Sequence, residues 1–250
     1  MKKSFILVIL TVVAFSVTAN PGQYQINQAC IDVGCFSGDN PATSTIEITH
    51  ASGTFVVTSD LVFDGTLNGV PAILVSRANN DSAITIDLNG FEIRYVGIPT
   101  ANTNGINVVG EDSVVRIKNG RIVSFADGVH AVDGVTIHAE NMLLQGNTDD
   151  GIQAPIGSIR NSTFDNNSYS IYAVSAEDQY NGDGLIIEGN QFFGVGQSVY
   201  SIGASNLCKD NMIGFTAANS NLGGCTLTGL NLCGSSPCVV NAINSAAHKE

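Results

Sequence analysis

Short apolar runs alternate with polar turns along most of the chain. Runs such as "AITIDLN", "FEIRYVG" and "GINVV" carry Ile, Val or Phe at alternate positions and are bounded by Asn, Gly, Asp or Ser. A period of two is typical of β-strands with one buried face. No segment after residue 19 has the apolar spacing of a long amphipathic helix. The pattern therefore predicts an all-β protein.

These runs recur in groups of three. One strand ends in Asn, a second follows at once, and a third begins after a polar turn, as in "NTNGINVVG", "FADGVHAVDG" and "NTDDGIQAPIG". The first apolar residue of the third strand falls at Ile106, Val129, Ile152, Ile171 and Val199, a mean step of about 23 residues. This step is too short for a strand–helix–strand unit, and crossovers between parallel strands are right-handed by default. We therefore predict a right-handed parallel β-helix, a solenoid with three strands per turn of about 23 residues.

The same repeat predicts interior and corner residues. Alternation places these third-strand residues inside: Ile106, Val108, Val129, Ala131, Ile152 and Ala154. The glycines that precede them, Gly105, Gly128 and Gly151, suit tight corners. The first strands end at Asn89, Asn119, Asn141, Asn161, Asn190 and Asn211. We expect these six Asn to stack at one corner as a structural ladder. Leucine-rich repeats also carry a periodic Asn, but their Leu-rich consensus is absent here.

The two ends of the chain differ from the repeats. Residues 1–19, "MKKSFILVILTVVAFSVTA", have a basic start, an apolar stretch and small residues before a cleavage point after Ala19. They predict a cleaved signal peptide, a mature chain without a transmembrane segment, and a secreted or periplasmic location. We expect an N-terminal cap at 20–45, the parallel β-helix at 46–225 and a C-terminal cap or tail at 226–250.

The charge and the cysteines indicate which partners are disfavoured and which compartment the protein occupies. The net charge is −12, and −14 without Lys2 and Lys3, which disfavours nucleic acid as a partner. The chain has six cysteines, an even number that suits disulfides in an oxidising compartment. Many pairings are open, and spacing favours the local ones: Cys30 with Cys35, Cys208 with Cys225, and Cys233 with Cys238.

The repeat units resemble a known class. The stretches "GTFVVTSDLVF", "ITIDLNGFEI" and "GINVVGEDSVVRIKNGRI" are similar to units of the secreted bacterial parallel β-helix repeat proteins of the pectin-lyase-like class, over roughly residues 46–225. The resemblance implies that the third strands form the sheet that carries the sugar cleft in pectate lyases and polygalacturonases. The outward column of that sheet would be Asn107, His130, Gln153, Tyr172 and Tyr200. Aromatic faces and planar amides are groups that bind sugars, so this column is the predicted ligand-binding site for an oligo- or polysaccharide.

The catalytic pattern of the class is incomplete. "NTNGINV" resembles the polygalacturonase motif Asn-Thr-Asp-Gly-Φ-Asp-Φ, with Φ apolar, but Asn104 and Asn107 replace both acids and the Gly-His-Gly motif is absent. An amide cannot transfer the proton that glycoside hydrolysis requires. A lyase would need a basic residue on the outward face of the third strands, where none is found.

The remaining candidates for acid–base chemistry are Asp127, His130, Asp149 and Asp150. The three Asp residues are also candidate Ca²⁺ ligands; no other cofactor and no Cys/His metal cluster is predicted. His138, on a first strand, has no catalytic partners in the repeat. The leading hypothesis is an exported, non-catalytic, glycan-binding or surface-associated β-helix. A polysaccharide lyase or glycoside hydrolase, and a purely structural or adhesive solenoid, are the alternatives.

Overall fold

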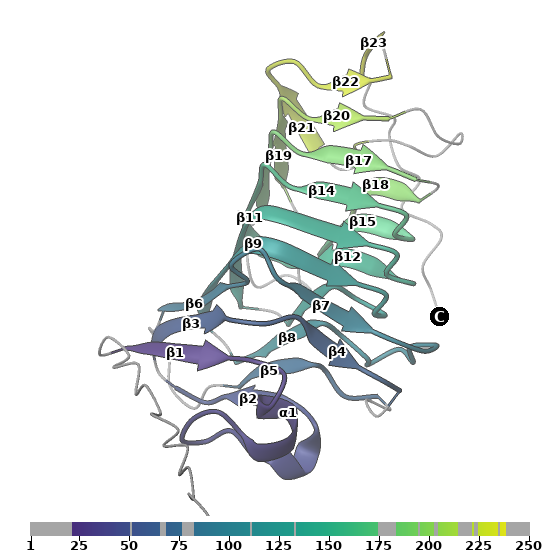
Figure 1. Cartoon of the computed structure of the whole chain (residues 1–250). Coiled ribbons are helices and arrows are strands. Elements are labelled where there is room, and N and C mark those ends of the chain that lie inside the picture. The colour runs from purple at the N-terminus through teal and green to yellow at the C-terminus, as the bar shows by residue number, and fades with distance from the viewer. Residues whose placement is uncertain are drawn as a thin grey trace, which may run out of the picture.

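The protein is an all-β structure built from long parallel sheets (Figure 1). The computed structural model describes residues 22–50, 52–65, 69–76, 83–110, 112–132, 134–174, 184–194, 196–202, 205–214, 222, 225–234 and 236–238. The expected signal peptide and the chain after residue 238 lie outside these described residues. Within them, the strands pair in parallel except for the last two, β22 and β23.

A seven-stranded sheet contains the predicted third strands. Its strands are β2 (Ile46–Ile48), β5 (Ile73–Ser76), β8 (Ile106–Val109), β10 (Val129–Ala131), β12 (Asp150–Gln153), β15 (Tyr169–Val174) and β18 (Gln197–Ile202). Each strand pairs in parallel with the strands of the preceding and following repeats. Figure 1 shows the resulting stack along the long axis of the molecule.

A sixteen-stranded sheet contains the predicted first and second strands as two rows. The first row holds β1 (Gln23–Ile26), β3 (Gly53–Val57), β6 (Ala83–Asp87), β13 (Ile156–Arg160), β16 (Leu185–Glu188), β19 (Asn206–Lys209) and β21 (Cys225–Thr228). The second row holds β4 (Leu61–Phe63), β7 (Glu92–Tyr95), β14 (Thr163–Asp165), β17 (Gln191–Phe193), β20 (Met212–Ile213), β22 (Leu232–Cys233) and β23 (Ser236–Pro237). The long strands β9 (Val114–Val123) and β11 (Thr136–Gln145) belong to both rows and join them.

The core consists of apolar columns that run along the stack. Strand pairing in the seven-stranded sheet aligns Ile46, Ile73, Ile106, Val129, Ile152, Ile171 and Val199, and all seven are buried. The interior positions predicted from alternation are likewise buried. Each turn of chain thus covers the apolar residues of its neighbours, which explains why the pattern repeats with one period.

The repeated glycines serve close packing rather than a special backbone conformation. Gly105, Gly128 and Gly151 do not have positive φ. A Cβ on Gly128 would lie 2.6 Å from the carbonyl oxygen of Gly151 and 2.8 Å from Leu144 Cδ1, and Gly105 is placed in the same way against Gly128. The expectation that these glycines are chosen for corner geometry is therefore wrong, because the backbone of the next turn and buried side chains such as Ile122 and Leu144 exclude a side chain at these positions.

The six predicted ladder Asn residues do not form one column. Asn119, Asn141 and Asn161 share one register, with φ between 48° and 60°, and Asn141 Nδ2 donates to Asn119 Oδ1 over 3.3 Å. Asn89 also has positive φ, but its Nδ2 donates to Val57 O. The next members of this corner column are Gly189 and Asp210 instead of Asn.

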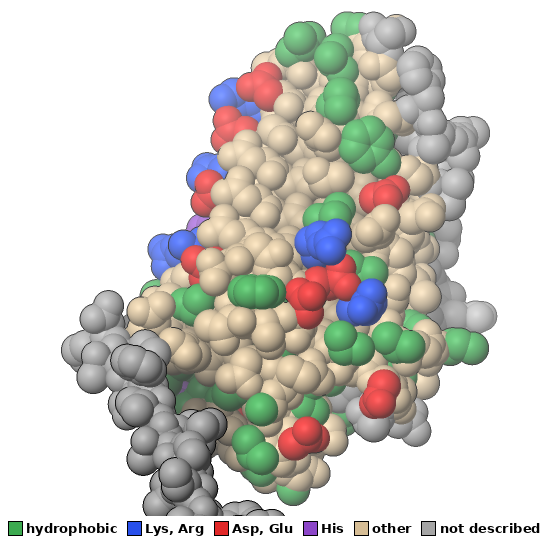
Figure 2. Space-filling model, in the orientation of Figure 1, with side chains coloured by type: hydrophobic (Ala, Val, Ile, Leu, Met, Phe, Trp, Pro, Cys, Tyr) green, Lys and Arg blue, Asp and Glu red, His purple; other side chains and the backbone are tan. Residues whose placement is uncertain are grey.

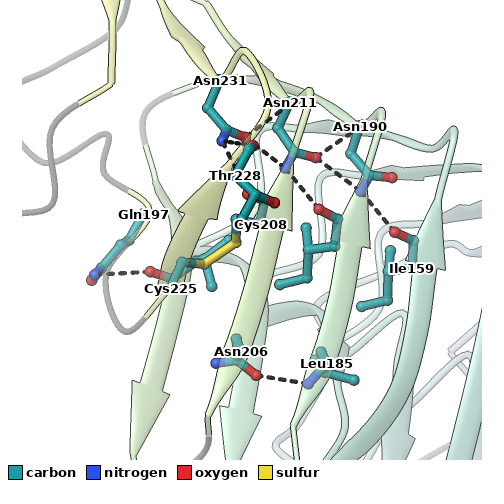
Figure 3. The surroundings of a disulfide bond; sticks show 12 residues. Ile159, Leu185, Asn190, Gln197, Asn206, Cys208, Asn211, Cys225, Thr228 and Asn231 are labelled. Carbon is teal, nitrogen blue, oxygen red and sulfur yellow. Dashed lines mark hydrogen bonds between the residues drawn. A yellow bond between two sulfur atoms is a disulfide. The ribbon is translucent and has the colours of Figure 1, made fainter.

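Asn190 and Asn211 lie one residue later, in a separate buried ladder that continues to Asn231 (Figure 3). Asn211 Oδ1 accepts from the backbone N–H of Asn190 at 3.0 Å and from its Nδ2 at 3.2 Å. Asn211 Nδ2 in turn donates to Ile187 O and to Asn231 Oδ1, at 2.8 and 3.0 Å. These side chains satisfy backbone groups that the turn removes from the strand ladder.

A second buried ladder lies at another corner of the stack. Asn147 Oδ1 accepts from the backbone N–H of Phe125 at 3.1 Å, and Asn147 Nδ2 donates to Asn167 Oδ1 at 2.9 Å. Asn167 Nδ2 donates to Leu144 O. This pair is absent from the predicted ladder; the recurrence of Asn 20 residues apart, after "QG" and "DN", is the signal that identifies it.

Disulfides lie near both ends of the stack, and two short helices lie at its N-terminal end. The bonds Cys30–Cys35, Cys208–Cys225 and Cys233–Cys238 confirm the local pairing. The N-terminal end also carries α1 (Cys30–Val33), the 3₁₀ helix η1 (Pro41–Thr43) and stacked rings of Tyr24 and Phe55. Parallel pairing extends beyond residues 46–225, because β1 pairs with β3 and β22 pairs with β20.

Together the repeated parallel pairings are consistent with a β-helix-like solenoid. Within the described residues, no helix is long and apolar enough to cross a membrane.

Candidate functional site

The residues of the predicted ligand-binding column are neighbours in successive strands of the seven-stranded sheet. Strand pairing aligns Asn107, His130, Gln153, Tyr172 and Tyr200. They alternate with the buried apolar column, so their side chains leave the sheet on the side away from the core. Neighbours in such a row lie about 5 Å apart, which brings five polar or aromatic side chains from five turns onto one surface.

Three tyrosines form one aromatic cluster at the upper part of this row. The rings of Tyr172 and Tyr200 are stacked, with centroids 5.4 Å apart and planes inclined by 18°. Tyr169, from the start of β15, lies 5.3 Å from the Tyr200 ring and 6.0 Å from the Tyr172 ring. Tyr169 is absent from the predicted site because it occupies a different column, two residues before the buried Ile171. We refer to these three residues as the tyrosine cluster.

The two predicted platform tyrosines differ in exposure. Tyr172 is half-buried, whereas Tyr200 is only 9% exposed. The expectation of two exposed rings is therefore wrong for Tyr200. Its ring lies against both Tyr172 and Tyr169, so it supports the cluster more than it presents a free face.

A stack of polar residues lies at or just before the first residues of β8, β10 and β12. Pairing of the adjacent strands aligns Asn104, Asp127 and Asp150. All three are buried, and Asp150 is 2% exposed. The backbone N–H of Asp150 donates to Asp127 Oδ1 at 3.1 Å. His130 Nδ1 lies 3.0 Å from Asp127 Oδ2, which fits a hydrogen bond from the ring N–H to the carboxylate.

Asp150 is the strongly perturbed group of this stack. Burial raises its pKa to about 9, and the charges of Asp127 and Asp149 act in the same direction. The Asp150 carboxyl is therefore protonated at neutral pH. Burial also raises the pKa of Tyr172, with smaller contributions from Tyr200 and Asp150. Phenol groups with raised pKa remain neutral hydrogen-bond donors at physiological pH.

Several buried oxygen atoms in and beside the stack have no hydrogen-bond partner among the described residues. They are Asn104 Oδ1, Asn107 Oδ1 and Asp150 Oδ1. Asp149, the fourth candidate for acid–base chemistry, is exposed and lies beside the stack rather than in it. The described residues include no group of three or more His, Cys, Asp or Glu side chains placed to hold a metal ion. The three predicted Ca²⁺ ligands thus do not converge as a set.

The seven-stranded sheet carries two kinds of functional group, one suited to binding a ligand and one suited to proton transfer. The tyrosine cluster and Gln153 offer aromatic and amide surface, and the Asp127–His130 pair offers an oriented imidazole at the edge of that surface. Asp127 and Asp150 themselves are almost inaccessible. Within the set formed by Asp127, His130 and Asp150, His130, with 27% of its side chain exposed, is thus the group that a ligand on the sheet can reach.

No family model matches the chain, and no curated protein or solved structure shows significant similarity to it.

Proposed function

We propose that the protein is an exported, right-handed parallel β-helix of the pectin-lyase-like class that binds a glycan along the seven-stranded sheet without cleaving it. The observation that carries this proposal is the tyrosine cluster, two members of which, Tyr172 and Tyr200, align with Gln153 and His130 on one outward column. The local disulfides support export, because such bonds persist in oxidising compartments.

The tyrosine cluster is suited to a sugar because its geometry is fixed before binding. Tyr172 is held on one side by the stacked Tyr200 ring, and Tyr169 lies against both. A platform that is already ordered loses little side-chain entropy when a ligand arrives. Sugar C–H groups pack on aromatic faces, while Gln153 and His130 provide hydrogen bonds to hydroxyl groups.

Charge favours a neutral or weakly charged glycan. The chain has a net charge of −12. Asp150 pairs with Tyr169 of the tyrosine cluster, Asp149 precedes it, and Asp127 lies one turn further from the cluster. A polyanion such as pectate would be repelled by Asp127 and Asp149 unless a cation bridged them.

Burial argues against catalysis by the carboxyl groups. A glycosidase needs one carboxyl to protonate the leaving oxygen and another to act as base or nucleophile, both in contact with substrate. Asp127 and Asp150 are 4% and 2% exposed, and both Asp127 oxygens are already engaged, one by the backbone N–H of Asp150 and the other by His130 Nδ1. Asp150 is therefore proposed as a structural acid rather than a catalytic one.

The Asp127–His130 pair supports an enzyme as the second candidate. A carboxylate on Nδ1 fixes the orientation of an imidazole, which leaves Nε2 directed away from the pair as a group that could transfer a proton. A lyase or hydrolase would then use His130 rather than the carboxyl groups expected in the class. A purely structural or adhesive solenoid, the third candidate, would use neither His130 nor the tyrosine cluster.

Binding and turnover are separated by one screen of the mature protein. The protein is applied to a glycan array with Ca²⁺ and with a chelator, and each binding glycan is then incubated with it and analysed for new reducing ends and unsaturated products. Saturable binding without products supports the binding protein. If products form and are lost in His130→Gln, the protein is an enzyme and the binding-protein proposal is wrong. Absence of both binding and products would favour the structural solenoid.

A further inference from the structure

A hollow on the other sheet gathers basic side chains in an otherwise acidic protein. It has a volume of about 280 Å³ and lies on the first row of the sixteen-stranded sheet, across β9, β11 and β13. Its lining consists of Arg116, Lys118, His138, Glu140, Ser158 and Arg160 together with the backbone between them. We call it the basic hollow. His138, the residue at its centre, has no part in the predicted site.

Strand pairing fixes how these side chains are placed. Arg116, His138 and Ser158 follow one another in one column, and Lys118, Glu140 and Arg160 in the column two residues further along the strands. His138 Nδ1 lies 2.8 Å from Ser158 Oγ. In either tautomer this bond leaves one donor for a ligand: the ring Nε2–H if the serine donates, or the serine O–H if the ring donates.

Arg116 differs from the other basic residues that the structure describes. Lys118 pairs with Asp87, Arg160 and Lys209 with Glu188, and Arg94 and Arg121 with Glu92. Arg116 is the one Lys or Arg in the described part of the chain for which no carboxylate lies within ion-pair distance. Figure 2 shows the common arrangement, with Lys and Arg side chains lying beside Asp and Glu. Arg116 therefore brings an uncompensated positive charge to the hollow.

The positive charges around the hollow affect the pKa of the His138 imidazole at its centre. Burial lowers the pKa of His138, and the charges of Arg116 and Arg160 lower it further. An anion placed among these three groups would offset both effects. Glu140 is the one acidic side chain of the lining and opposes an anion.

We propose that the basic hollow binds a sulfate or phosphate ester group of a larger ligand, through Arg116, Arg160 and the His138–Ser158 pair. Guanidinium groups bind such oxyanions with two parallel hydrogen bonds, and the hydroxyl and ring groups supply further donors. The hollow is several times the roughly 30 Å³ that one water molecule occupies in the liquid, so it has room for the oxyanion and part of the group that carries it. This site lies on a different sheet from the tyrosine cluster and does not depend on the proposed glycan binding.

The test follows the His138 imidazole by NMR in the mature protein, at constant ionic strength, while glucose 6-sulfate or glucose 6-phosphate replaces chloride. His138→Gln assigns the resonance. Binding of either ester should shift this resonance and raise the pH at which the ring titrates. Binding of glucose 6-sulfate, which keeps one charge throughout, should also become stronger as the pH falls through that value, because a protonated ring adds a positive charge beside Arg116, Lys118, Glu140 and Arg160, the charged groups around it. Glucose 6-phosphate is compared at one pH only, because the ester itself gains a proton at about pH 6. Inorganic sulfate and acetate are the parallel probes.

Matched variants locate the effect. Arg116→Gln and Arg160→Gln should each weaken ester binding by about fivefold or more, since each removes a charge-assisted pair of hydrogen bonds. Glu140→Gln should strengthen it, and Arg94→Gln, which removes an equal charge elsewhere, should leave it unchanged. The proposal is overturned if Arg94→Gln weakens binding as much as Arg116→Gln, if acetate binds as well as the esters, or if only inorganic sulfate shifts His138.

Discussion

Asp127 and Asp150 occupy equivalent positions in adjacent turns, and the backbone N–H of Asp150 donates to Asp127 Oδ1 over 3.1 Å. Two buried carboxyl groups in one column cannot both be charged at low cost. In this pair Asp150 takes the proton, and its pKa rises to about 9. The repeat thus places a neutral acid beside a carboxylate that orients His130.

The first prediction concerns pH and stability. The folded state retains the Asp150 proton up to about pH 9, whereas the unfolded chain releases it near 3.8. The folded state therefore holds more protons in this window, and the stabilisation present at low pH is lost as the pH rises, by at most about 1.4 kcal/mol per pH unit. Asp150→Asn, which mimics the protonated acid, should match the wild type only at or below about pH 3.8, and its advantage in thermal stability should widen steadily from there to pH 8.

The difference between the two melting curves is the quantity to measure, because other groups also titrate. Asp112→Asn, a change at an exposed Asp outside the stack, is the control and should follow the wild type at every pH. If wild type and Asp150→Asn give parallel curves from pH 5 to 8, Asp150 is not protonated in the folded protein.

The second prediction separates the two Asn columns. Asn211 is fully buried with bonds on both faces of its amide, so Asn211→Ala should cost about 3 kcal/mol by leaving several backbone and amide groups unpaired. Asn141 is exposed with φ of 55° and one amide bond, so Asn141→Ala should cost about 1 kcal/mol, mostly through its left-handed backbone.

Denaturant unfolding of both variants measures this contrast, and Asn141→Gly, which tolerates positive φ, should recover most of the Asn141→Ala loss. Equal losses for Asn141→Ala and Asn211→Ala would contradict this prediction, because the exposed corner column and the buried ladder would then contribute equally to the free energy of unfolding.

The third prediction tests the close approach at the repeated glycines. A methyl group on Gly128 would meet the Gly151 carbonyl oxygen, which belongs to a backbone that cannot move independently. Gly128→Ala should therefore lower stability by about 3 kcal/mol, the cost of severe overpacking. Gly90 has positive φ, and no atom lies within 4 Å of the position that a Cβ would take there, so Gly90→Ala should lose only about 1 kcal/mol. Thermal melting of the two proteins shows whether contact or backbone conformation dominates.

The fourth prediction concerns the disulfide between neighbouring turns. Cys208 on β19 and Cys225 on β21 close a loop of 17 residues, so replacing both by Ala should cost about 3 kcal/mol. Replacing Cys30 and Cys35, which are separated by five residues, should cost about 2 kcal/mol. Denaturant unfolding should rank the two double variants in this order, and the reverse order would contradict the loop-entropy account.

The repeat is predictable from the sequence because it depends on local patterns. Alternation fixes which face of a strand is buried, and a constant step fixes which residues of successive turns are neighbours. These two facts are sufficient to align His130 with Gln153 and Tyr172, as the strand pairing confirms. The disulfide pairs follow from short spacing in the same way.

The features that the sequence does not predict depend on turn length. Gly189 and Asp210 take the corner conformation in the upper turns, so Asn190 and Asn211 move one position into the buried ladder. Burial of Tyr200 and Asp150 likewise depends on contacts across turns rather than on the residue type. The basic hollow combines residues from three strands, and no one repeat unit contains enough of it to be recognised.

Glycan binding by the tyrosine cluster is tested most directly by calorimetric titration of a glycan from the array into the Tyr172→Ala variant. Loss of the Tyr172 face should weaken binding by about 1–2 kcal/mol. Phe193→Ala removes an exposed ring on β17, outside the seven-stranded sheet, and should leave the affinity unchanged. Full affinity in Tyr172→Ala, or an equal loss in both variants, would contradict the account.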